Sequence, residues 1–405
     1  MRIAMVNNYL YVRGGSERVM FEEGEALHDR GIEVFYFGQH RPDDPPMAHD
    51  DLFPPYVDPF TLPAVCKLAQ AFRVIYNPDV KRRFAQFIDR VRPDIIHGHN
   101  IYGGLTTAVC DVARAHGIPM VLTLHDYKLL CPAYTMQSRD GICDRCRHGQ
   151  FFHCLAGSCH KGSRLYSLFY TLESYFNRWL KKYDAIDTFI CPSQFLAGLI
   201  RHSWLENPHA VYLPNAVNCQ RLLPSPTPGD YALFVGRLTP GKGTKLLLRA
   251  VAPLKGVPLH VVGDGPKRQQ LTELARQMCC EDRIVFRGYL QGDALSEAYR
   301  QAAMLVIPSE WSENAPMSVL EAMAHGKPVV GSALGGIPEM VRHEENGLLT
   351  PPGDVEALRT HVYRLWTHPA LRIEMGRNGR ELVEKQYSLR QHRTRLLDVY
   401  RRAAA

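Results

Sequence analysis

The segment MLVIPSEWSENAPMSVLEAMAHGKPVVG, residues 304–331, joins two short apolar runs through a loop and an amphipathic stretch. The runs 304–307 and 328–331 are dominated by aliphatic residues, and residues 316–325 between them suit a helix that begins at a proline. A strand, a helix and a second strand in this order predict a parallel βαβ unit.

The same alternation continues on both sides of this unit. The expected strands are 2–8, 33–38, 94–97, 119–124, 186–191, 210–213, 231–236, 259–262, 283–286, 304–307 and 328–331. The expected helices are 16–29, 66–90, 104–116, 164–182, 194–203, 244–252, 267–279, 293–302, 316–325 and 354–366, with further helix after 370. We therefore predict an α/β protein of two doubly wound Rossmann-like domains that face a central cleft.

The boundary between the domains is expected where this pattern lapses. Residues 214–229, PNAVNCQRLLPSPTPG, are rich in proline and lack periodicity, and residues 40–63 carry seven prolines that predict an irregular loop. The expected parts are a first domain at 1–216 with a Cys-rich insertion at 128–162, a linker at 217–229, a second domain at 230–370, and C-terminal helices at 371–405 that pack back on the first domain.

The composition is that of a globular protein. Of the 405 residues, 45% are hydrophobic and 22% are charged, which excludes a disordered, collagen-like or fibrous chain. Apolar runs are too short for a membrane span, and the start MRIAMVNNY lacks the pattern of a secretory signal, so we expect a cytoplasmic protein. The net charge of +7 suits an anionic ligand or an anionic membrane surface without choosing between them.

Two loops that follow expected strands carry residues suited to anions. Gly14 and Gly15 precede a helix whose first N–H groups can hold an anion, although an ordinary tight turn would use the same glycines. Arg237 and Lys242 flank a Pro-Gly turn and can converge on one diphosphate, although a solvated basic loop would look the same. Neither segment is a dinucleotide fingerprint or a P-loop.

Other candidate residues follow further expected strands. They are His125, Gly263, Glu313 with Asn314, Ala315 and Pro316, Glu321, Gly335 and Gly336. Carboxylates accept hydrogen bonds from sugar hydroxyls, so Glu313 and Glu321 are suited to hold two different sugars, with helix-terminal or solvated charges as the alternative. Because the carboxyl ends of parallel strands share one edge of a sheet, these residues are expected to line the cleft.

These segments also recur together in a fixed order. The motifs are GGSERV, HD after a strand, CPS, LPNAV, VGRLTPGKG, VGDGP, IVFRGYL, IPSEWSENAPMSVLEAMAHGKPVV, GGIPEMV and NGLLTPPGD. In this order they closely resemble the retaining glycosyltransferases of family 4, from residue 2 to about residue 366 and most specifically over 304–353. The resemblance implies the two-domain glycosyltransferase B-type fold and transfer of a sugar from a nucleotide diphosphate, with retention at the anomeric carbon and without a catalytic metal.

The resemblance implies roles for the matching residues. His125 would contact the transferring sugar, while Arg237 and Lys242 would bind the donor diphosphate and neutralise its charge as it leaves. Glu313 would hold hydroxyls of the donor sugar, and Glu321 those of the ribose. The remaining donor-binding positions would be Gly14, Gly15, Gly263, Gly288, Asn314, Ala315, Pro316, Gly335 and Gly336.

One departure limits what the resemblance says about the donor. Family members often have Gly-Phe-Gly after the first glutamate, where this chain has Asn-Ala-Pro at 314–316. We expect a UDP- or GDP-sugar donor bound by residues 230–370, and a glycan or lipid-linked glycan acceptor bound by residues 1–216, in cell-surface polysaccharide synthesis. No second carboxylate is placed as a covalent nucleophile, which favours front-face attack.

A cysteine-rich segment, residues 131–159, stands apart from these motifs. A C-x2-C spacing brings two thiolates onto one metal, so a structural zinc ion is expected there, with free thiols, a disulfide or an iron–sulfur cluster as alternatives. The proposed ligands are Cys143, Cys146, Cys154 and Cys159. Residues 128–182 hold nine basic and three acidic side chains beside several aromatic ones, which suits peripheral contact with an anionic membrane or a buried aromatic helix with a solvated basic face.

Two other functions are compatible with these patterns. A sugar-nucleotide 2-epimerase would use the same fold and would need no acceptor. A non-catalytic, zinc-bearing binding protein would use only the cysteines and the positive charge. Nucleic acid is not an expected partner, because the sequence has no helix-turn-helix, no aromatic RNA-binding set and no complete zinc-finger spacing.

Overall fold

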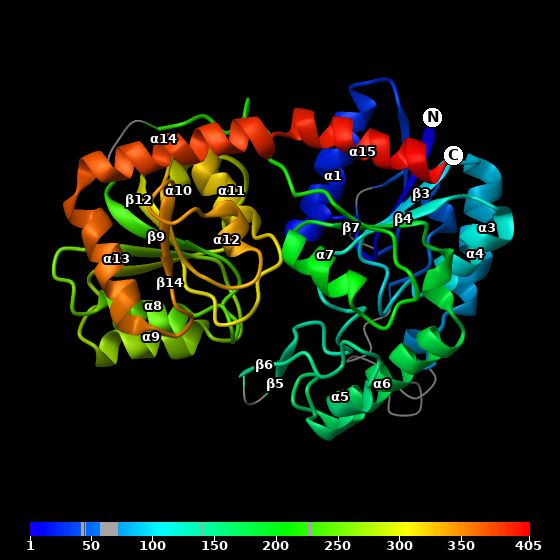
Figure 1. Ribbon diagram of the computed structural model, residues 1–405, viewed down its shortest axis with the longest axis horizontal. Helices are drawn as coiled ribbons and strands as arrows, with labels where there is room; N and C mark the ends of the chain where they lie inside the picture. The colour runs from blue at the N-terminus through cyan, green and yellow to red at the C-terminus, as the bar shows by residue number, and fades with distance from the viewer. Residues whose placement is uncertain (42–43, 45, 57–71, 139–140, 226–228) are drawn as a thin grey trace. The chain divides into compact units, whose positions relative to one another are not determined.

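The chain forms two compact units, described here from a computed structural model (Figure 1). The structure describes residues 1–405 apart from 42–43, 45, 57–71, 139–140 and 226–228. The loop 40–63, the start of the helix 66–90 and the linker 217–229 lie partly outside the described residues. The first unit is Met1–Pro214 with His392–Ala405, and the second is Asn215–Gln391, which places the expected linker within the second unit.

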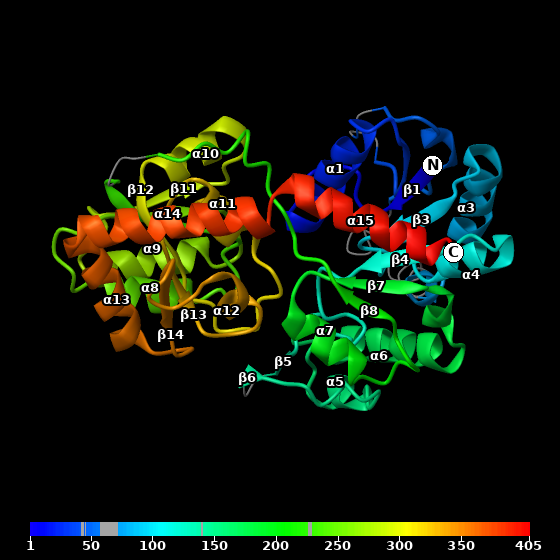
Figure 2. The ribbon, with the colours of Figure 1, turned by 45° about the horizontal axis from the view of Figure 1, so that its top comes forward.

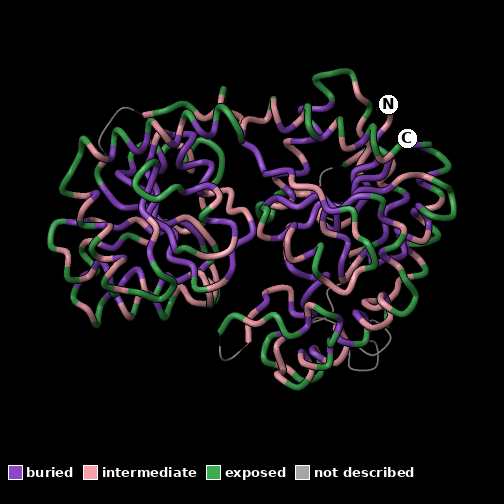
Figure 3. Tube along the Cα trace, in the orientation of Figure 1, coloured by how far each residue is buried: buried purple, intermediate pink, exposed green. Residues whose placement is uncertain are grey.

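A parallel six-stranded sheet forms the centre of the first unit, in the order β2-β1-β3-β4-β7-β8. Its strands are β1 (Arg2–Val6), β2 (Glu33–Phe37), β3 (Ile95–Gly98), β4 (Met120–Thr123), β7 (Thr188–Cys191) and β8 (Ala210–Tyr212). Strands β3, β4 and β7 are buried along their whole length (Figure 3), which explains why they are apolar runs rather than alternating patterns.

The helices of this unit are α1 (Gly15–His28), α3 (Pro78–Val91), α4 (Ala108–His116), α6 (Arg164–Trp179), α7 (Gln194–Arg201) and α15 (Leu389–Ala403). The shorter elements are η1 (Asp50–Leu52), η2 (Lys182–Ala185), α5 (Phe152–Ala156) and the antiparallel pair β5 (Gln137–Ser138) and β6 (Gly141–Ile142). Side-chain caps fix three helix starts, because Asn77, Ser163 and Ser193 each accept a hydrogen bond from a backbone N–H of the first turn. The elements β5, β6 and α5 form the Cys-rich insertion between β4 and α6 (Figure 2).

The second unit has the same architecture, with a parallel sheet in the order β11-β10-β9-β12-β13-β14. Its strands are β9 (Tyr231–Val235), β10 (Leu259–Val262), β11 (Ile284–Gly288), β12 (Ala302–Ile307), β13 (Val329–Ser332) and β14 (Gly347–Thr350). Its helices are α8 (Thr244–Val251), α9 (Arg268–Gln277), α10 (Gly292–Arg300), α11 (Met317–Ala324), α12 (Ile337–Met340), α13 (Val355–Thr367) and α14 (Pro369–Gln386).

The two parallel sheets confirm the predicted α/β class. The edge strand β14 was not predicted, because its four residues lie between turn-forming segments and are too short to show a period. Pro316 stands at the N-cap of α11 rather than inside its first turn. Among the described residues, no helix combines the length and the apolar character that crossing a bilayer requires.

Candidate functional site

Three loops meet where strands of the second sheet end. The N–H of Gly236, after β9, donates to the carbonyl of Val262 at 3.0 Å, and the N–H of Gly263, after β10, donates to the carbonyl of Gly288 at 2.7 Å. Gly263 has φ +130°, and a Cβ there would lie 1.9 Å from the carbonyl oxygen of Gly236. Only glycine permits this contact, so the glycines predicted here bring the loops together.

The carboxylate of Glu313, in the loop after β12, is the centre of this region. The ammonium of Lys242 lies 2.7 Å from Oε1 and 3.0 Å from Oε2. The hydroxyl of Ser309 and the indole N–H of Trp311 both donate to Oε1 at 2.7 Å. Burial alone would raise the pKa of Glu313, but the charge and hydrogen bond of Lys242, with the hydrogen bonds of Ser309 and Trp311, outweigh burial and lower it.

The glycine pair after β13 completes this cluster. The N–H of Gly336 donates to the carbonyl of Glu313 at 2.7 Å. Gly335 has φ +62°, and a Cβ there would lie 2.2 Å from the same carbonyl oxygen. The structure therefore brings together Lys242, Glu313, Gly335 and Gly336, four residues predicted from three separate motifs.

The other predicted residues of this unit lie around the cluster. Arg237 is exposed in the loop after β9, where its guanidinium can meet a ligand. Glu321 is buried on α11 and accepts a hydrogen bond from the hydroxyl of Tyr299 at 2.7 Å. The carbonyl of Ala315 accepts from the side chain of Asn215 at 3.0 Å, which ties the Asn-Ala-Pro loop to the start of the unit.

In the first unit, His125 follows β4 and is half-buried. Its Nε2 lies 3.0 Å from Nδ1 of His99, which follows β3. Nε2 of His99 in turn faces a carboxylate oxygen of Glu23, on α1, at 3.5 Å. His125 therefore ends a chain of polar groups that runs into the core. Gly14 and Gly15 are exposed at the start of the same helix, α1.

His392, on α15, supplies the charge that this chain needs. Its Nε2 lies 2.7 Å from the other oxygen of Glu23, and its Nδ1 lies 2.7 Å from the carbonyl oxygen of Pro214. Burial alone would raise the pKa of Glu23, but the hydrogen bond and charge of His392 outweigh it and lower the pKa. Both ring nitrogens of His392 thus have an oxygen partner within hydrogen-bonding distance.

Burial keeps the other two rings of this chain neutral. It lowers the pKa of His99 well below its usual value and that of His125 to about 4, so both are neutral near pH 7. A proton of His99 on Nε2, toward the Glu23 carboxylate, would leave its Nδ1 to accept from Nε2–H of His125. Nδ1 of His125 would then be a hydrogen-bond acceptor.

Glu23, His97 and His99 also satisfy a simple geometric test for a metal site. Within the described ranges, they are the group of three His, Cys, Asp or Glu whose donor atoms all lie within 4.8 Å of one another. His97 is already engaged in hydrogen bonds, since its Nδ1 lies 2.7 Å from the hydroxyl of Tyr400 and its Nε2 lies 2.8 Å from that of Thr123. Both ring nitrogens of His97 thus have protein partners.

The predicted zinc ligands lie in the insertion as free thiols. Cys146 and Cys154 are buried, while Cys143 and Cys159 are partly exposed. Burial raises the pKa of Cys146, and the neighbouring Cys131, Cys154 and Cys143 raise it further. In the part of the chain that the structure describes, no three of these sulfurs lie within 4.8 Å of one another, so the thiols are neighbours without metal-ligand spacing.

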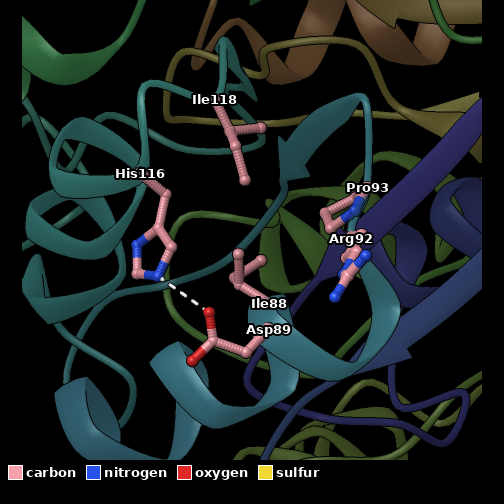
Figure 4. A pocket seen from close by; sticks show the side chains of 6 residues that line it. All are labelled: Ile88, Asp89, Arg92, Pro93, His116 and Ile118. Carbon is pink, nitrogen blue, oxygen red and sulfur yellow. Dashed lines mark ion pairs between the residues drawn. The ribbon is translucent and has the colours of Figure 1, made fainter.

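A pocket in the first unit lies at the opposite ends of the strands from His99 and His125. It is lined by Ile88, Asp89, Arg92, Pro93, His116 and Ile118 (Figure 4). His116 and Asp89 form an ion pair across it at 3.4 Å. Pro93 precedes β3 and Ile118 precedes β4, so the pocket is at the amino ends of these strands, whereas His99 and His125 follow their carboxyl ends.

Sequence reasoning missed several members of both clusters. His99 carried a usable signal, because His-Gly-His at 97–99 closes an apolar strand. Glu23 and His392 carried none, since they are 369 residues apart and each belongs to an ordinary amphipathic helix. Ser309 and Trp311 lie inside a motif that was recognised, but nothing in the motif shows that they donate to Glu313.

The buried histidines predict destabilisation by acid. In the unfolded chain they take up protons near pH 6.5, whereas His97 and His125 in the folded chain do so only near pH 4. The free energy of unfolding should therefore fall between about pH 6.5 and 4, by up to about 1.4 kcal/mol per pH unit for each histidine. Urea unfolding at several pH values measures this slope.

A matched pair of variants tests the assignment. His97→Asn combined with His125→Asn should flatten the slope, while His202→Asn, at an exposed position, should leave it unchanged. Equal stability of the wild-type chain at pH 7 and pH 5 would contradict the neutral, buried state of these rings.

Known proteins share this chain's sequence over long stretches. The 2-deoxystreptamine N-acetyl-D-glucosaminyltransferase of Streptomyces fradiae is 30% identical over 311 residues, covering 73% of this chain and 70% of that protein. Sulfoquinovosyl transferase SQD2 of Arabidopsis thaliana is 29% identical over 75% of this chain and 56% of its own length. An uncharacterised glycosyltransferase of Methanocaldococcus jannaschii is 34% identical over 42% of this chain and 44% of its own length. The chain thus spans about half the length of the last two.

Solved structures share the whole fold. Sucrose-phosphate synthase from Thermosynechococcus elongatus superposes with a TM-score of 0.75 at 22% identity, over 99% of this chain and 98% of that one. Anabaena HepE, solved in complex with UDP and glucose, superposes with a TM-score of 0.69 at 17% identity, over 98% of this chain and 99% of that one. These likenesses confirm the predicted glycosyltransferase B-type fold.

Two family models divide the chain between them. Residues 13–221 match the model described as Glycosyltransferase Family 4, and residues 221–382 match the model described as Glycosyl transferases group 1. The first match alone covers more than half of the chain, and both agree with the resemblance carried by the sequence motifs. The chain belongs to glycosyltransferase family 4.

Proposed function

We propose that the protein is a retaining glycosyltransferase that moves a sugar from a UDP- or GDP-sugar to a glycan or lipid-linked glycan. The reaction would serve cell-surface polysaccharide synthesis at the cytoplasmic face of a membrane. The observation that carries the proposal is the cluster of Lys242, Glu313 and Gly335–Gly336 at the strand ends of the second unit. The exposed Arg237 lies in the same loop as Lys242. The names of the relatives, several of which are glycosyltransferases, support the same reaction class.

The donor diphosphate is assigned to the cations of the second unit. The ammonium of Lys242 donates to Glu313, but it has three N–H donors and its side chain is partly exposed. It can therefore also donate to a diphosphate oxygen. Glu313 thus positions Lys242. Ser309 and Trp311 donate to its Oε1, so its Oε2, which accepts from Lys242, would also accept from a hydroxyl of the donor sugar. Arg237 would add a planar fork to the same diphosphate, and Glu321 would bind the ribose.

In the proposed reaction the bond between the anomeric carbon and the diphosphate oxygen breaks, and its electron pair leaves with the oxygen. The acceptor hydroxyl oxygen bonds to the same face of the anomeric carbon, and its proton passes to the departing phosphate oxygen. Arg237 and Lys242 would stabilise the negative charge that develops on the diphosphate. One well-placed hydrogen-bond donor lowers the activation free energy by about 3 kcal/mol. No metal is assigned to this step. Nδ1 of His125, left as an acceptor by its bond to His99, would accept from a hydroxyl of the transferring sugar.

The epimerase alternative shares the diphosphate site but differs in its substrates. An epimerase would equilibrate a sugar nucleotide without an acceptor, whereas a transferase requires one. The experiment is a panel of UDP- and GDP-sugars scored first by thermal shift and then by turnover with and without glycan acceptors. A donor present at 100 times its Kd stabilises the folded state by about 2.7 kcal/mol. Failure of every nucleotide diphosphate to bind would favour the non-catalytic alternative.

Lys242→Ala is expected to lower kcat by about 100- to 1,000-fold, because it removes a charge from the leaving diphosphate. The control is Lys245→Ala, which removes an exposed lysine three residues later and should keep full activity. Melting of both variants separates loss of chemistry from loss of folding, because Lys242 also compensates the buried Glu313. A folded Lys242→Ala variant with wild-type kcat would contradict the assignment.

A structural zinc ion is a separate proposal for the Cys-rich insertion, with Cys143, Cys146, Cys154 and Cys159 as ligands. Its support is the grouping of these thiols with Cys131 in one small region. Tetrahedral zinc with Zn–S bonds of about 2.3 Å needs sulfurs about 3.8 Å apart. Binding would therefore draw the thiols closer and release their protons.

We expect about one zinc per purified chain, and a lower melting temperature after chelation. Cys143→Ser with Cys146→Ser should lose the metal, while Cys279→Ser, at an exposed cysteine of the second unit, should keep it. Elemental analysis and thermal melting measure both effects. A wild-type protein that contains no zinc, and whose melting temperature does not change on chelation, would exclude the zinc site and support the free-thiol alternative.

A further inference from the structure

Helix α6 is amphipathic in the inverse sense, because its polar side faces the core. The buried residues of α6 are Ser167, Thr171, Glu173, Ser174 and Asn177. Several of its large apolar side chains face outward: Leu165 is 62% exposed, Leu172 44% and Trp179 74%, and the C-cap Leu180 is 51% exposed. A surface helix of a globular protein usually has the opposite arrangement.

Specific partners hold the polar side of α6 in place. Asn177 accepts from the hydroxyl of Thr107 at 2.7 Å and donates to Glu173 at 2.8 Å. Glu173 forms a buried ion pair with Lys128. These contacts are specific and buried, so turning the helix to hide its apolar side would leave buried charges and amides unpaired. The orientation of α6 is therefore fixed by its polar residues.

The outward residues form one continuous feature, which we call the apolar stripe: Leu165, Leu172, Trp179 and Leu180. Seven residues are close to two helical turns, so positions 165, 172 and 179 lie in line over about 21 Å. Stacking of Trp179 on Tyr175, with ring centroids 5.2 Å apart, holds the indole at the end of the stripe. Phe152 of α5 is also 52% exposed, and its N–H donates to the hydroxyl of Tyr175, so this residue extends the apolar surface.

Positive charge surrounds the stripe. Residues 161–182 include five basic side chains and one acidic one, Glu173, which is buried with Lys128. Lys161 and Arg164 are exposed at the start of α6. Lys181, just beyond its end, is also exposed and forms an ion pair with the exposed Glu206 at 2.9 Å. Apolar and aromatic side chains flanked by lysine and arginine are the pattern of a helix that lies in the interface of an anionic bilayer.

We propose that α6 docks the protein on an anionic lipid surface, with the apolar stripe inserted among the acyl chains and the flanking cations on the headgroups. A second copy of the chain is a poorer occupant. A two-fold contact through the stripe would bring Lys161 and Arg164 of one copy toward the same cations of the other, and like charges repel. The proposal goes beyond the sugar-transfer reaction and does not depend on it.

The test is co-sedimentation of the full chain with phosphatidylglycerol–phosphatidylcholine vesicles and with phosphatidylcholine vesicles alone. We expect binding to the anionic vesicles that weakens at high salt. The variant Leu165→Ser, Leu172→Ser, Trp179→Ser should bind about tenfold or more weakly, since each lost apolar side chain removes buried area in the interface. The matched control is Leu223→Ser, Tyr363→Ser, Ile373→Ser, which removes three equally exposed apolar side chains from the second unit.

Each outcome bears on the proposal. Wild-type binding that the stripe variant loses and the control keeps supports it. Wild-type failure to bind anionic vesicles, or a stripe variant that binds like the wild type, overturns it. If the wild type does not bind vesicles and the stripe variant changes the oligomeric state, the proposal is overturned and the stripe is a contact between copies of the chain. Nucleotide-sugar thermal shift, measured on the same samples, reports folding and donor binding separately, so failure of docking and failure of the transferase assignment are distinguishable.

Discussion

The buried carboxylate of Glu313 is the constraint that organises the second unit. A charge out of contact with water must be compensated, and here Lys242, Ser309 and Trp311 all point to it. Meeting this requirement fixes the loop after β9 against the loop after β12, and the carbonyl of the same residue fixes the glycines after β13. The loops that would meet a donor are thus held by one side chain and its own backbone.

The first unit also buries a carboxylate, and a residue far away in the sequence compensates its charge. Glu23 is buried on α1, and its countercharge comes from His392 on α15, near the other end of the chain. The terminal helix is therefore part of the polar core of this unit, and Tyr400 on the same helix bonds to His97. Buried networks of this kind are costly when incomplete and specific when complete. Through His99, the network reaches His125.

Much of the fold was predictable because its causes are local. Parallel strands that are buried on both faces are apolar runs, and the helices between them repeat apolar residues with the helical period. The βαβ order could therefore be predicted from residues 304–331 outward. Ligand-binding residues at the carboxyl ends of such strands follow from the same geometry. Two kinds of contact could not be predicted. Glu23 and His392 pair across almost the whole chain. Ser309 and Trp311 are near Glu313 in sequence, but the motif does not show that they donate to it. Helix α6 shows a second limit, because its period predicted a helix near 164–182 while only its polar partners decide which side is buried.

The central claim is that Lys242, held by Glu313, and Arg237 grip the diphosphate of a sugar nucleotide. The most direct measurement is a crystal structure of the protein with the donor that the thermal-shift panel identifies. The account predicts diphosphate oxygens within hydrogen-bonding distance of the Lys242 ammonium and the Arg237 guanidinium, with the lysine still in contact with Glu313. A diphosphate bound in the second unit but out of reach of both cations, or bound elsewhere in the chain, would contradict it.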